Sequence, residues 1–129
     1  MFKIGTDIAS VKRIAAAYER FGERFLDRIL TDRERDYVLS QPPHTISRLA
    51  GRFAAKEAAS KALGTGWHGV GWKEIEILRL PSGEPSLTLH GRAARIASNK
   101  GLDHWEVTVS HEREYAVSTV LAYSANQAK

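Results

Sequence analysis

The first part of the chain combines one stretch of strand-like alternation with two stretches of helical spacing. Residues 2–8 alternate between apolar and polar or small side chains, which predicts a short strand because successive strand residues point to opposite faces. Ser10 can then cap a helix that reaches about residue 21 and stops at Gly22. A further helical turn is expected at residues 25–30.

The next segment contains the longest predicted helix. Thr31 and Glu34 have the spacing of a capping box, which begins a short helix, and Pro42-Pro43 ends it because proline has no amide hydrogen to donate. An alanine-rich helix is then expected over residues 45–63, and Gly64 closes it.

Beyond a glycine-rich loop at residues 65–71, the hydrophobic period changes from helical to two. Strands are expected around residues 75–77, 87–89, 105–109 and 115–121, with turns at 81–83 and 113–114 and one helix at 92–99. Helices therefore gather in the first half of the chain and strands in the second. This order predicts an α+β fold in which a mainly antiparallel sheet packs around a long central helix.

Length and composition limit the class of protein. A chain of 129 residues has room for one core, so we expect a single domain over residues 1–123 and a frayed tail at 124–129. The hydrophobic content of 43% is typical of globular proteins and excludes a disordered chain, and the absence of cysteine excludes disulfides and thiolate sites. Without a run of about 20 apolar residues or a signal peptide, the protein is expected in the cytoplasm.

The positive charge is unevenly distributed. The net charge is +4, and the whole excess lies in residues 1–63, which carry twelve Lys or Arg against eight Asp or Glu. A localised basic excess suits an acidic partner, which could be a nucleic acid, a phosphorylated small molecule or an acidic protein. A mixed solvated surface is the alternative, and charge alone leaves both open.

Glu57 stands out because it lies on the apolar side of the long helix. At about 100° per residue, it falls between Ile46 and Ala50. A buried ionised carboxylate is costly, so such a group is normally paired, protonated or bound to a metal. Lys61 follows one turn later, so Glu57 either forms an ordinary i, i+4 pair with it or belongs to a functional site.

Asp7 is a second candidate, at the end of the first strand near Gly5. It could simply begin the following helix. Together with Glu57 it would supply two hard oxygen ligands, and one or two carboxylates completed by phosphates and water commonly hold Mg²⁺. Two weaker signals stay ambiguous: His111 is a core residue or a ligand, and the loop at residues 64–66 is a helix stop or an anion-binding nest.

Four groups of residues follow one another along the chain in a telling order. They are Gly5-Thr6-Asp7-Ile8 with Arg13-Ile14, Arg52-Phe53-Ala54-Ala55-Lys56-Glu57-Ala58, Lys61-Ala62-Leu63-Gly64-Thr65-Gly66, and Val109-Ser110-His111-Glu112 with Tyr115-Ala116. This series resembles the holo-[acyl-carrier-protein] synthases, the small single-domain class of 4′-phosphopantetheinyl transferases. The resemblance spans nearly the whole chain and is most specific from Arg52 to Gly66. The chain departs from the family pattern at Thr6, at Gly83-Glu84-Pro85 and at Trp67-His68-Gly69, which enlarges the glycine loop.

The resemblance implies transfer of the phosphopantetheine arm of coenzyme A to a serine hydroxyl of an acyl carrier protein, with release of adenosine 3′,5′-bisphosphate. Asp7 and Glu57 would hold Mg²⁺ against the coenzyme A diphosphate. Glu57 would also orient or deprotonate the serine, and Lys61 would stabilise charge on the leaving phosphate. The implied coenzyme A contacts are Arg52, Lys56, Gly64, Thr65, Ser110 and His111.

The resemblance also implies that the first helix meets the carrier protein, which is acidic. If the helical phase continues past Gly22, Arg13, Arg20 and Arg24 point the same way, and Arg28 flanks them. Acidic residues are interleaved with these arginines, so a plain solvated face is the alternative. The family further implies a homotrimer whose sites are shared between neighbouring subunits.

A different class of function is a noncatalytic basic α+β module that binds RNA or another phosphorylated ligand. The basic first half and the eleven aromatic residues favour it. The three tryptophans, however, lack the arginine- or glycine-flanked pattern of a platform that stacks single-stranded bases. An inactive carrier-binding subunit is disfavoured because both acidic candidates and the lysine are present.

Overall fold

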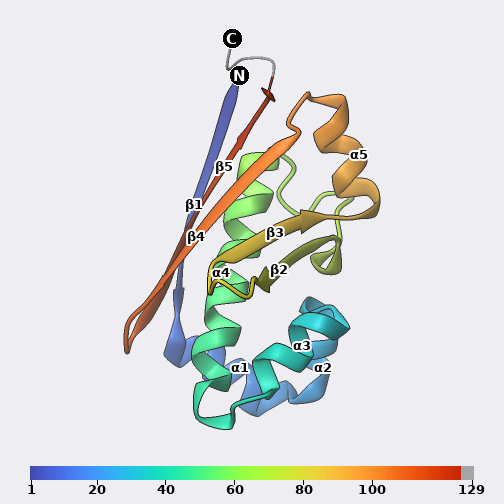
Figure 1. Ribbon diagram of the computed structural model, residues 1–129. Coiled ribbons are helices and arrows are strands. Elements are labelled where there is room, and N and C mark those ends of the chain that lie inside the picture. Colours follow the sequence, from blue (N-terminus) through green and yellow to red (C-terminus); the bar gives the residue numbers. More distant parts are fainter. Residues whose placement is uncertain (126–129) are drawn as a thin grey trace.

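One long helix carries two antiparallel sheets and a group of short helices (Figure 1). The computed structural model describes residues 1–125. Its elements in chain order are β1 (Phe2–Ser10), α1 (Val11–Phe21), α2 (Glu23–Ile29), α3 (Asp32–Leu39), the 3₁₀ turn η1 (Pro42–His44), α4 (Thr45–Leu63), the 3₁₀ turn η2 (Trp72–Glu74), β2 (Ile75–Arg79), β3 (Pro85–Leu89), α5 (Gly91–Asn99), β4 (His104–His111) and β5 (Tyr115–Tyr123). The expected α+β class is confirmed, and α4 has the predicted limits.

Local signals in the sequence set the ends of the short helices. The Ser10 side chain accepts a hydrogen bond from the Arg13 amide at 3.2 Å and caps α1. Thr31 and Glu34 form both bonds of the capping box at the start of α3. Gly22 has a φ of 58° and separates α1 from α2. The helical phase therefore does not continue past Gly22, and the assumption of one continuous arginine face is wrong.

The two sheets lie against α4, which contributes small side chains to a common core. β5 is the middle strand of the three-stranded sheet, with antiparallel β1 and β4 on either side, and β2 and β3 form a separate hairpin. The alanines in the second half of α4 share one buried cluster with Ile75 and Ile77 of β2 and with Val120 of β5; they are Ala55, Ala58, Ala59 and Ala62. This cluster connects both sheets through the helix.

Two glycines bring the three-stranded sheet close to the helix. A Cβ atom at Gly5 of β1 would overlap the carbonyl oxygen of Ala58, so β1 crosses α4 at the distance of backbone contact. On α4 itself, Gly51 leaves room for the imidazole ring of His111 from β4. The sheet therefore touches the helix at both ends of the segment that contains Glu57.

The outer face of the three-stranded sheet exposes several large apolar side chains. Phe2, Ile4 and Ile8 of β1 are 65%, 69% and 59% exposed, and Tyr115 and Val117 of β5 are also exposed. Ile8 pairs directly with Val117, so these side chains share one face. The alternation predicted the strand correctly, but its apolar side faces away from α4 and its small residues face the helix.

The chain end was expected to be frayed from residue 124. The structure describes it only as far as Ala125, whose amide donates to Asp103 Oδ1 at 3.0 Å. The rest of that expected tail, residues 126–129, lies outside the described residues. Over residues 1–125, no helix has the length and apolar character needed to cross a membrane.

Candidate active site

Asp7 and Lys61 meet where β1 crosses α4. Asp7 lies two residues beyond Gly5 on β1 and therefore on the same, helix-facing side of the strand. The Lys61 ammonium donates to Asp7 Oδ1 and to the Thr6 carbonyl oxygen, both at 3.0 Å. The side chain of Asp7 is 18% exposed and that of Lys61 is 53% exposed, so the pair lies at an open edge of the crossing.

Glu57 lies one helical turn before Lys61 and on the same side of α4. It is half-buried, and within residues 1–125 its carboxylate has one hydrogen bond, from Trp67 Nε1 to Oε1 at 3.2 Å. Lys61 pairs with Asp7, so the alternative of an ordinary Glu57–Lys61 helix pair is wrong. The Glu57 carboxylate therefore retains most of its capacity to accept hydrogen bonds.

The chemistry of Asp7 and Glu57 fits a divalent cation shared with a substrate. Mg²⁺ prefers hard oxygen ligands and is commonly bound by one or two carboxylates together with phosphate oxygens and water. In the part of the chain that the structure describes, no group of three or more His, Cys, Asp or Glu side chains could hold a metal ion. Two carboxylates leave coordination positions for phosphate oxygens and water, so Asp7 and Glu57 suit an ion that a phosphorylated substrate helps to bind.

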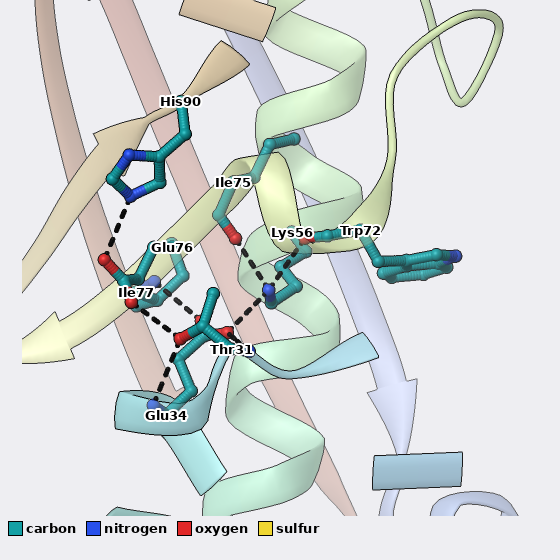
Figure 2. Close-up of polar contacts among 8 residues, drawn as sticks. All are labelled: Thr31, Glu34, Lys56, Trp72, Ile75, Glu76, Ile77 and His90. Carbon is teal, nitrogen blue, oxygen red and sulfur yellow. Dashed lines mark hydrogen bonds and ion pairs between the residues drawn. The ribbon is translucent and has the colours of Figure 1, made fainter. Parts of the chain in front are cut away.

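Lys56, which was expected to contact coenzyme A, lies in the core (Figure 2). Its fully buried ammonium donates to Glu34 Oε1 at 2.8 Å, to the Trp72 carbonyl oxygen at 2.8 Å and to the Ile75 carbonyl oxygen at 2.6 Å. Burial lowers the pKa of Lys56, while the charge of Glu34 opposes that shift. An ammonium has three hydrogens, so none is left for a ligand. The expected contact is wrong, and Lys56 instead ties α4 to α3, η2 and β2.

Glu34 and Glu76 extend this buried cluster toward His90 (Figure 2). Glu34 Oε2 accepts from the Ile77 amide at 2.7 Å. Glu76 accepts from the Thr31 hydroxyl at 2.6 Å and bonds the His90 ring at 3.0 Å. Burial raises the pKa of Glu76, but these two hydrogen bonds and the charge of His90 outweigh burial and hold it below its usual range. The cluster is fully bonded and has the character of a structural network.

Arg52 of α4 and His111 of β4, two of the expected coenzyme A contacts, lie near each other. The buried Arg52 guanidinium lies 4.3 Å from the ring centroid of Tyr37, and its Nε has no hydrogen-bond partner within residues 1–125. Burial lowers the pKa of Arg52. Burial and the charge of Arg52 lower the pKa of His111, and a hydrogen bond with the Ser47 backbone partly offsets them. These effects favour the neutral form of the His111 ring more than in a free imidazole.

The other expected coenzyme A contacts lie apart from this pair. Ser110 precedes His111 on β4 and so points to the outer face of the sheet. Gly64 ends α4 with a φ of 86°, and its amide and that of Gly66 both donate to the Ser60 carbonyl oxygen. Since both amides complete the helix end, the loop that holds Gly64 and Thr65 is a helix stop rather than an open nest of amides.

The arginines expected to meet the carrier protein border two cavities with shared aromatic walls. Arg24 and Arg28 line a cavity of about 460 Å³, and Arg13 lines another of about 300 Å³. Phe25 and Phe53 line both cavities. The arginines of α1 and α2 thus surround a common apolar floor despite the break in helical phase.

Arg20 and the neighbouring acidic residues complete the charge pattern of this surface. The guanidinium of Arg20 lies 5.1 Å from the ring centroid of Phe21. Glu23 and Asp27, which are interleaved with the arginines in the sequence, both form ion pairs with Arg35 of α3. One guanidinium offsets only one of these two negative charges. The five arginines, Arg35 included, still outnumber the three acidic residues Glu19, Glu23 and Asp27, so the surface around the two cavities carries a net positive charge.

The sequence matches the family model described as the 4′-phosphopantetheinyl transferase superfamily over residues 3–120. The chain belongs to this superfamily. Among curated members, it is 52% identical over 120 residues to the holo-[acyl-carrier-protein] synthase of Gloeobacter violaceus, which covers 93% of this chain and 91% of the relative. It is 47% identical over 118 residues to that of Koribacter versatilis, which covers 91% of this chain and 94% of the relative.

Solved structures of the superfamily share the fold. The holo-[acyl-carrier-protein] synthase of Neisseria meningitidis superposes with a TM-score of 0.86 at 35% identity and covers 95% of this chain and 98% of its own. That of Helicobacter pylori, in complex with coenzyme A, superposes with a TM-score of 0.82 at 30% identity and covers 93% and 99%. This phosphopantetheinyl transferase therefore moves the phosphopantetheine group of coenzyme A to an apo acyl carrier protein.

Sequence reasoning missed two contacts in this transferase. Lys56 was assigned to a ligand although Leu49 and Leu63, seven residues away on either side, share its side of α4 and are buried. That spacing is a signal that could have placed Lys56 in the core. The bond from Trp67 to Glu57 had no such signal, because the loop that carries Trp67 has no periodic pattern.

Proposed function

We propose that the transfer takes place at the edge where β1 crosses α4, with Asp7 and Glu57 binding Mg²⁺ and Lys61 beside them. The Lys61–Asp7 ion pair at 3.0 Å carries this proposal, because it ties Asp7 to the residue that follows Glu57 by one turn of α4. All three side chains are at least partly exposed, in contrast to the fully buried Glu34 and Lys56. A bound cation would neutralise the diphosphate of coenzyme A and the charge that develops on it.

The chain's own residues would share the remaining chemistry. Glu57 would orient the serine hydroxyl of the carrier and accept its proton while the serine oxygen bonds to the phosphorus that carries the pantetheine arm. The bond from that phosphorus to the bridging oxygen breaks, and adenosine 3′,5′-bisphosphate leaves. The Lys61 ammonium would donate to the leaving phosphate, where negative charge accumulates.

We propose that Arg52 and His111 bind coenzyme A at its phosphate groups. The unpartnered Nε of the buried Arg52 supports this, because a buried donor without an acceptor is costly and an anion would satisfy it. Thr65 and Gly64 would border the ligand at the end of α4. Ser110, which faces outward, would reach coenzyme A only in the site of a neighbouring subunit.

We further propose that the positive surface of α1 and α2 docks the acidic carrier protein. Its support is the combination of an apolar floor with Arg13, Arg24 and Arg28 around it. Such charges mainly raise the association rate, and salt screens them. Arg24→Glu should therefore raise KM for the carrier and flatten its salt dependence, whereas Arg95→Glu on α5 should change neither. Equal KM values at low salt for the Arg24 variant and the unmodified protein would exclude this surface.

The exposed apolar face of the three-stranded sheet supports a homotrimer with sites at the subunit interfaces, as the family implies. Side chains such as Ile4 and Ile8 are more than half exposed in one chain, and exposed apolar patches of this kind mark association surfaces. Light scattering should give three times the mass of the chain, and Ile8→Asp should reduce it. A monomeric mass for the unmodified protein would refute the assembly.

The decisive experiment is a mass measurement of the carrier protein. With Mg²⁺, coenzyme A and the apo carrier, the carrier should gain the mass of one phosphopantetheine group, and a chelator should prevent the gain. Transfer that is undiminished in the chelator would refute the metal proposal. Tight RNA binding without transfer would favour the noncatalytic module instead.

We expect residues 1–123 to act as one domain, and we expect the protein to act in the cytoplasm.

A further inference from the structure

The indole of Trp67 is the group that the protein itself places on the Glu57 carboxylate. Its Nε1 donates to Glu57 Oε1 at 3.2 Å, and no other hydrogen bond reaches that carboxylate within residues 1–125. A carboxylate with one oxygen bonded in this way has a preferred rotation, and its second oxygen is left for other partners. The contact therefore restrains the Glu57 carboxylate and leaves its second oxygen available to other partners.

An aromatic stack holds Trp67 in this position. Its ring lies against that of Trp72, with centroids 3.9 Å apart and planes 24° apart, and Trp72 in turn stacks on Phe53 at 5.2 Å. Phe53 and Glu57 are one turn apart on α4, so they lie on the same side of the helix. The stack therefore begins at Phe53 on α4, and its last ring, that of Trp67, donates the hydrogen bond to Glu57 on the same helix face.

The stack is anchored in the core through the backbone of Trp72. The Trp72 carbonyl oxygen accepts a hydrogen bond from the fully buried Lys56 ammonium at 2.8 Å, and Figure 2 shows the Trp72 ring extending away from that bond. Lys56 directly precedes Glu57 in α4. One turn of α4 thus holds the backbone of Trp72 through Lys56 and also carries Glu57, whose carboxylate accepts the hydrogen bond from Trp67.

We propose that Trp67 is a positioning residue that sets the orientation of the Glu57 carboxylate for the transfer reaction. The Trp67 N–H occupies Oε1 and directs Oε2 toward the cation and the serine hydroxyl. This role rests on the proposed function of Glu57. Hydrogen-bonding partners of metal-binding or catalytic groups have effects of about 10- to 100-fold on activity or metal affinity when removed.

Trp67→Phe is the direct test, because it keeps an aromatic ring for the stack and removes the N–H donor together with one ring of the indole. We expect kcat to fall about 10- to 100-fold with KM for the carrier unchanged. Calorimetry should show that coenzyme A binding needs more Mg²⁺ to reach half-saturation, which a merely structural role would not produce. The thermal midpoint should fall by no more than it does when Trp105, which also packs against the buried cluster, is changed to Phe.

Trp105→Phe is the matched control. It removes one indole hydrogen bond as well, because Trp105 Nε1 donates to the Leu102 carbonyl oxygen at 2.8 Å, but this bond does not involve Glu57. Its kcat and its Mg²⁺ requirement should equal those of the unmodified protein. A similar loss in both variants would overturn the proposal, because it would show a general effect on packing.

The hydrogen bond can also be observed without any catalysis. In Glu57→Gln, the indole proton resonance of Trp67 should move upfield because a neutral amide replaces the charged acceptor, and that of Trp105 should not move. Full activity of Trp67→Phe beside an inactive Glu57→Gln would refute the positioning role and leave the proposed function intact. An active Glu57→Gln would instead refute the proposed function.

Discussion

Lys56 and Glu57 are consecutive residues of α4, yet the charge of Lys56 is buried and fully hydrogen-bonded, whereas that of Glu57 is half-buried and has few partners. Lys56 lies in the core, where three acceptors satisfy its three hydrogens. Glu57 is half-buried one turn before Lys61, which pairs with Asp7, and within residues 1–125 it receives one hydrogen bond, from Trp67. The step of about 100° between successive helical residues is enough to separate a fully paired buried charge from one with unused hydrogen-bonding capacity.

The difference shows how to distinguish the two kinds of charge. A buried charge is tolerated when every hydrogen or lone pair has a partner, and such a group has no capacity left for a ligand. A charge with unused capacity at an exposed edge can bind a substrate. The degree of hydrogen-bond saturation, rather than the presence of a charge in an apolar helix, therefore separates the buried cluster from the site.

Substitutions at the open edge should give the largest effect. Glu57→Gln and Asp7→Asn should each reduce transfer by roughly 10³-fold, because each removes a carboxylate from the proposed reacting centre. Their free energies of unfolding should change by no more than about 1 kcal/mol, since the Asp7–Lys61 pair is partly exposed and such pairs contribute little. The carrier mass assay and urea denaturation measure the two quantities. Undiminished transfer by either variant would show that the substituted carboxylate has no role in the reaction.

The buried cluster should show the opposite behaviour. Lys56→Met should cost about 3–5 kcal/mol of stability, because it leaves the buried Glu34 carboxylate without its counter-ion. Glu34→Gln in the same chain should recover part of that loss, since the neutral amide needs no counter-ion. Urea denaturation of the single and double variants gives the coupling between the two residues.

The coenzyme A affinity of folded Lys56→Met distinguishes the two roles considered for this lysine. Calorimetry at a temperature where the variant is folded should give an affinity close to that of the unmodified protein. A loss of affinity without a loss of stability would show that Lys56 contacts the ligand after all.

The smallest effect concerns the pH dependence of the cluster at Glu76. Since the pKa of Glu76 in the folded protein lies below its ordinary value of 4.5, its ionised form stabilises the fold at neutral pH. The stabilisation by ionised Glu76 should disappear as the pH falls from 4.5 through the lower pKa of Glu76 in the folded protein. Glu76→Gln should therefore be about 1–2 kcal/mol less stable than the unmodified protein at pH 7 and nearly equal to it in acid. Urea midpoints across this range test the sign, and a difference that grows on acidification would contradict it.

Much of the fold could be read from the sequence because its signals are local. Ser10 and Gly22 delimit α1, the capping box of Thr31 and Glu34 begins α3, and the limits of α4 follow from its spacing and Gly64. The conflict between Glu57 and its apolar surroundings was also visible. These features depend on residues that are at most a few positions apart.

The remaining features depend on contacts between distant segments. The pairing of Lys56 with Glu34 joins residues 22 positions apart, and Glu34 had already been explained by its capping role. The outward direction of Ile4 and Ile8 follows from how closely β1 approaches α4, which alternation alone does not specify. The direction of Arg24 depends on the backbone angle at Gly22, and a helical wheel drawn through that residue cannot represent it.

The absence of a side chain at Gly5 has a consequence for how the enzyme can evolve. The spacing between strand and helix at that point is set by two main chains in contact, so no compensating change of a neighbouring side chain can restore it once a methyl group is introduced. Asp7 is carried by the same strand. In a library that is randomised at position 5, in cells whose growth depends on the activity of this enzyme, we therefore expect the surviving variants to retain glycine.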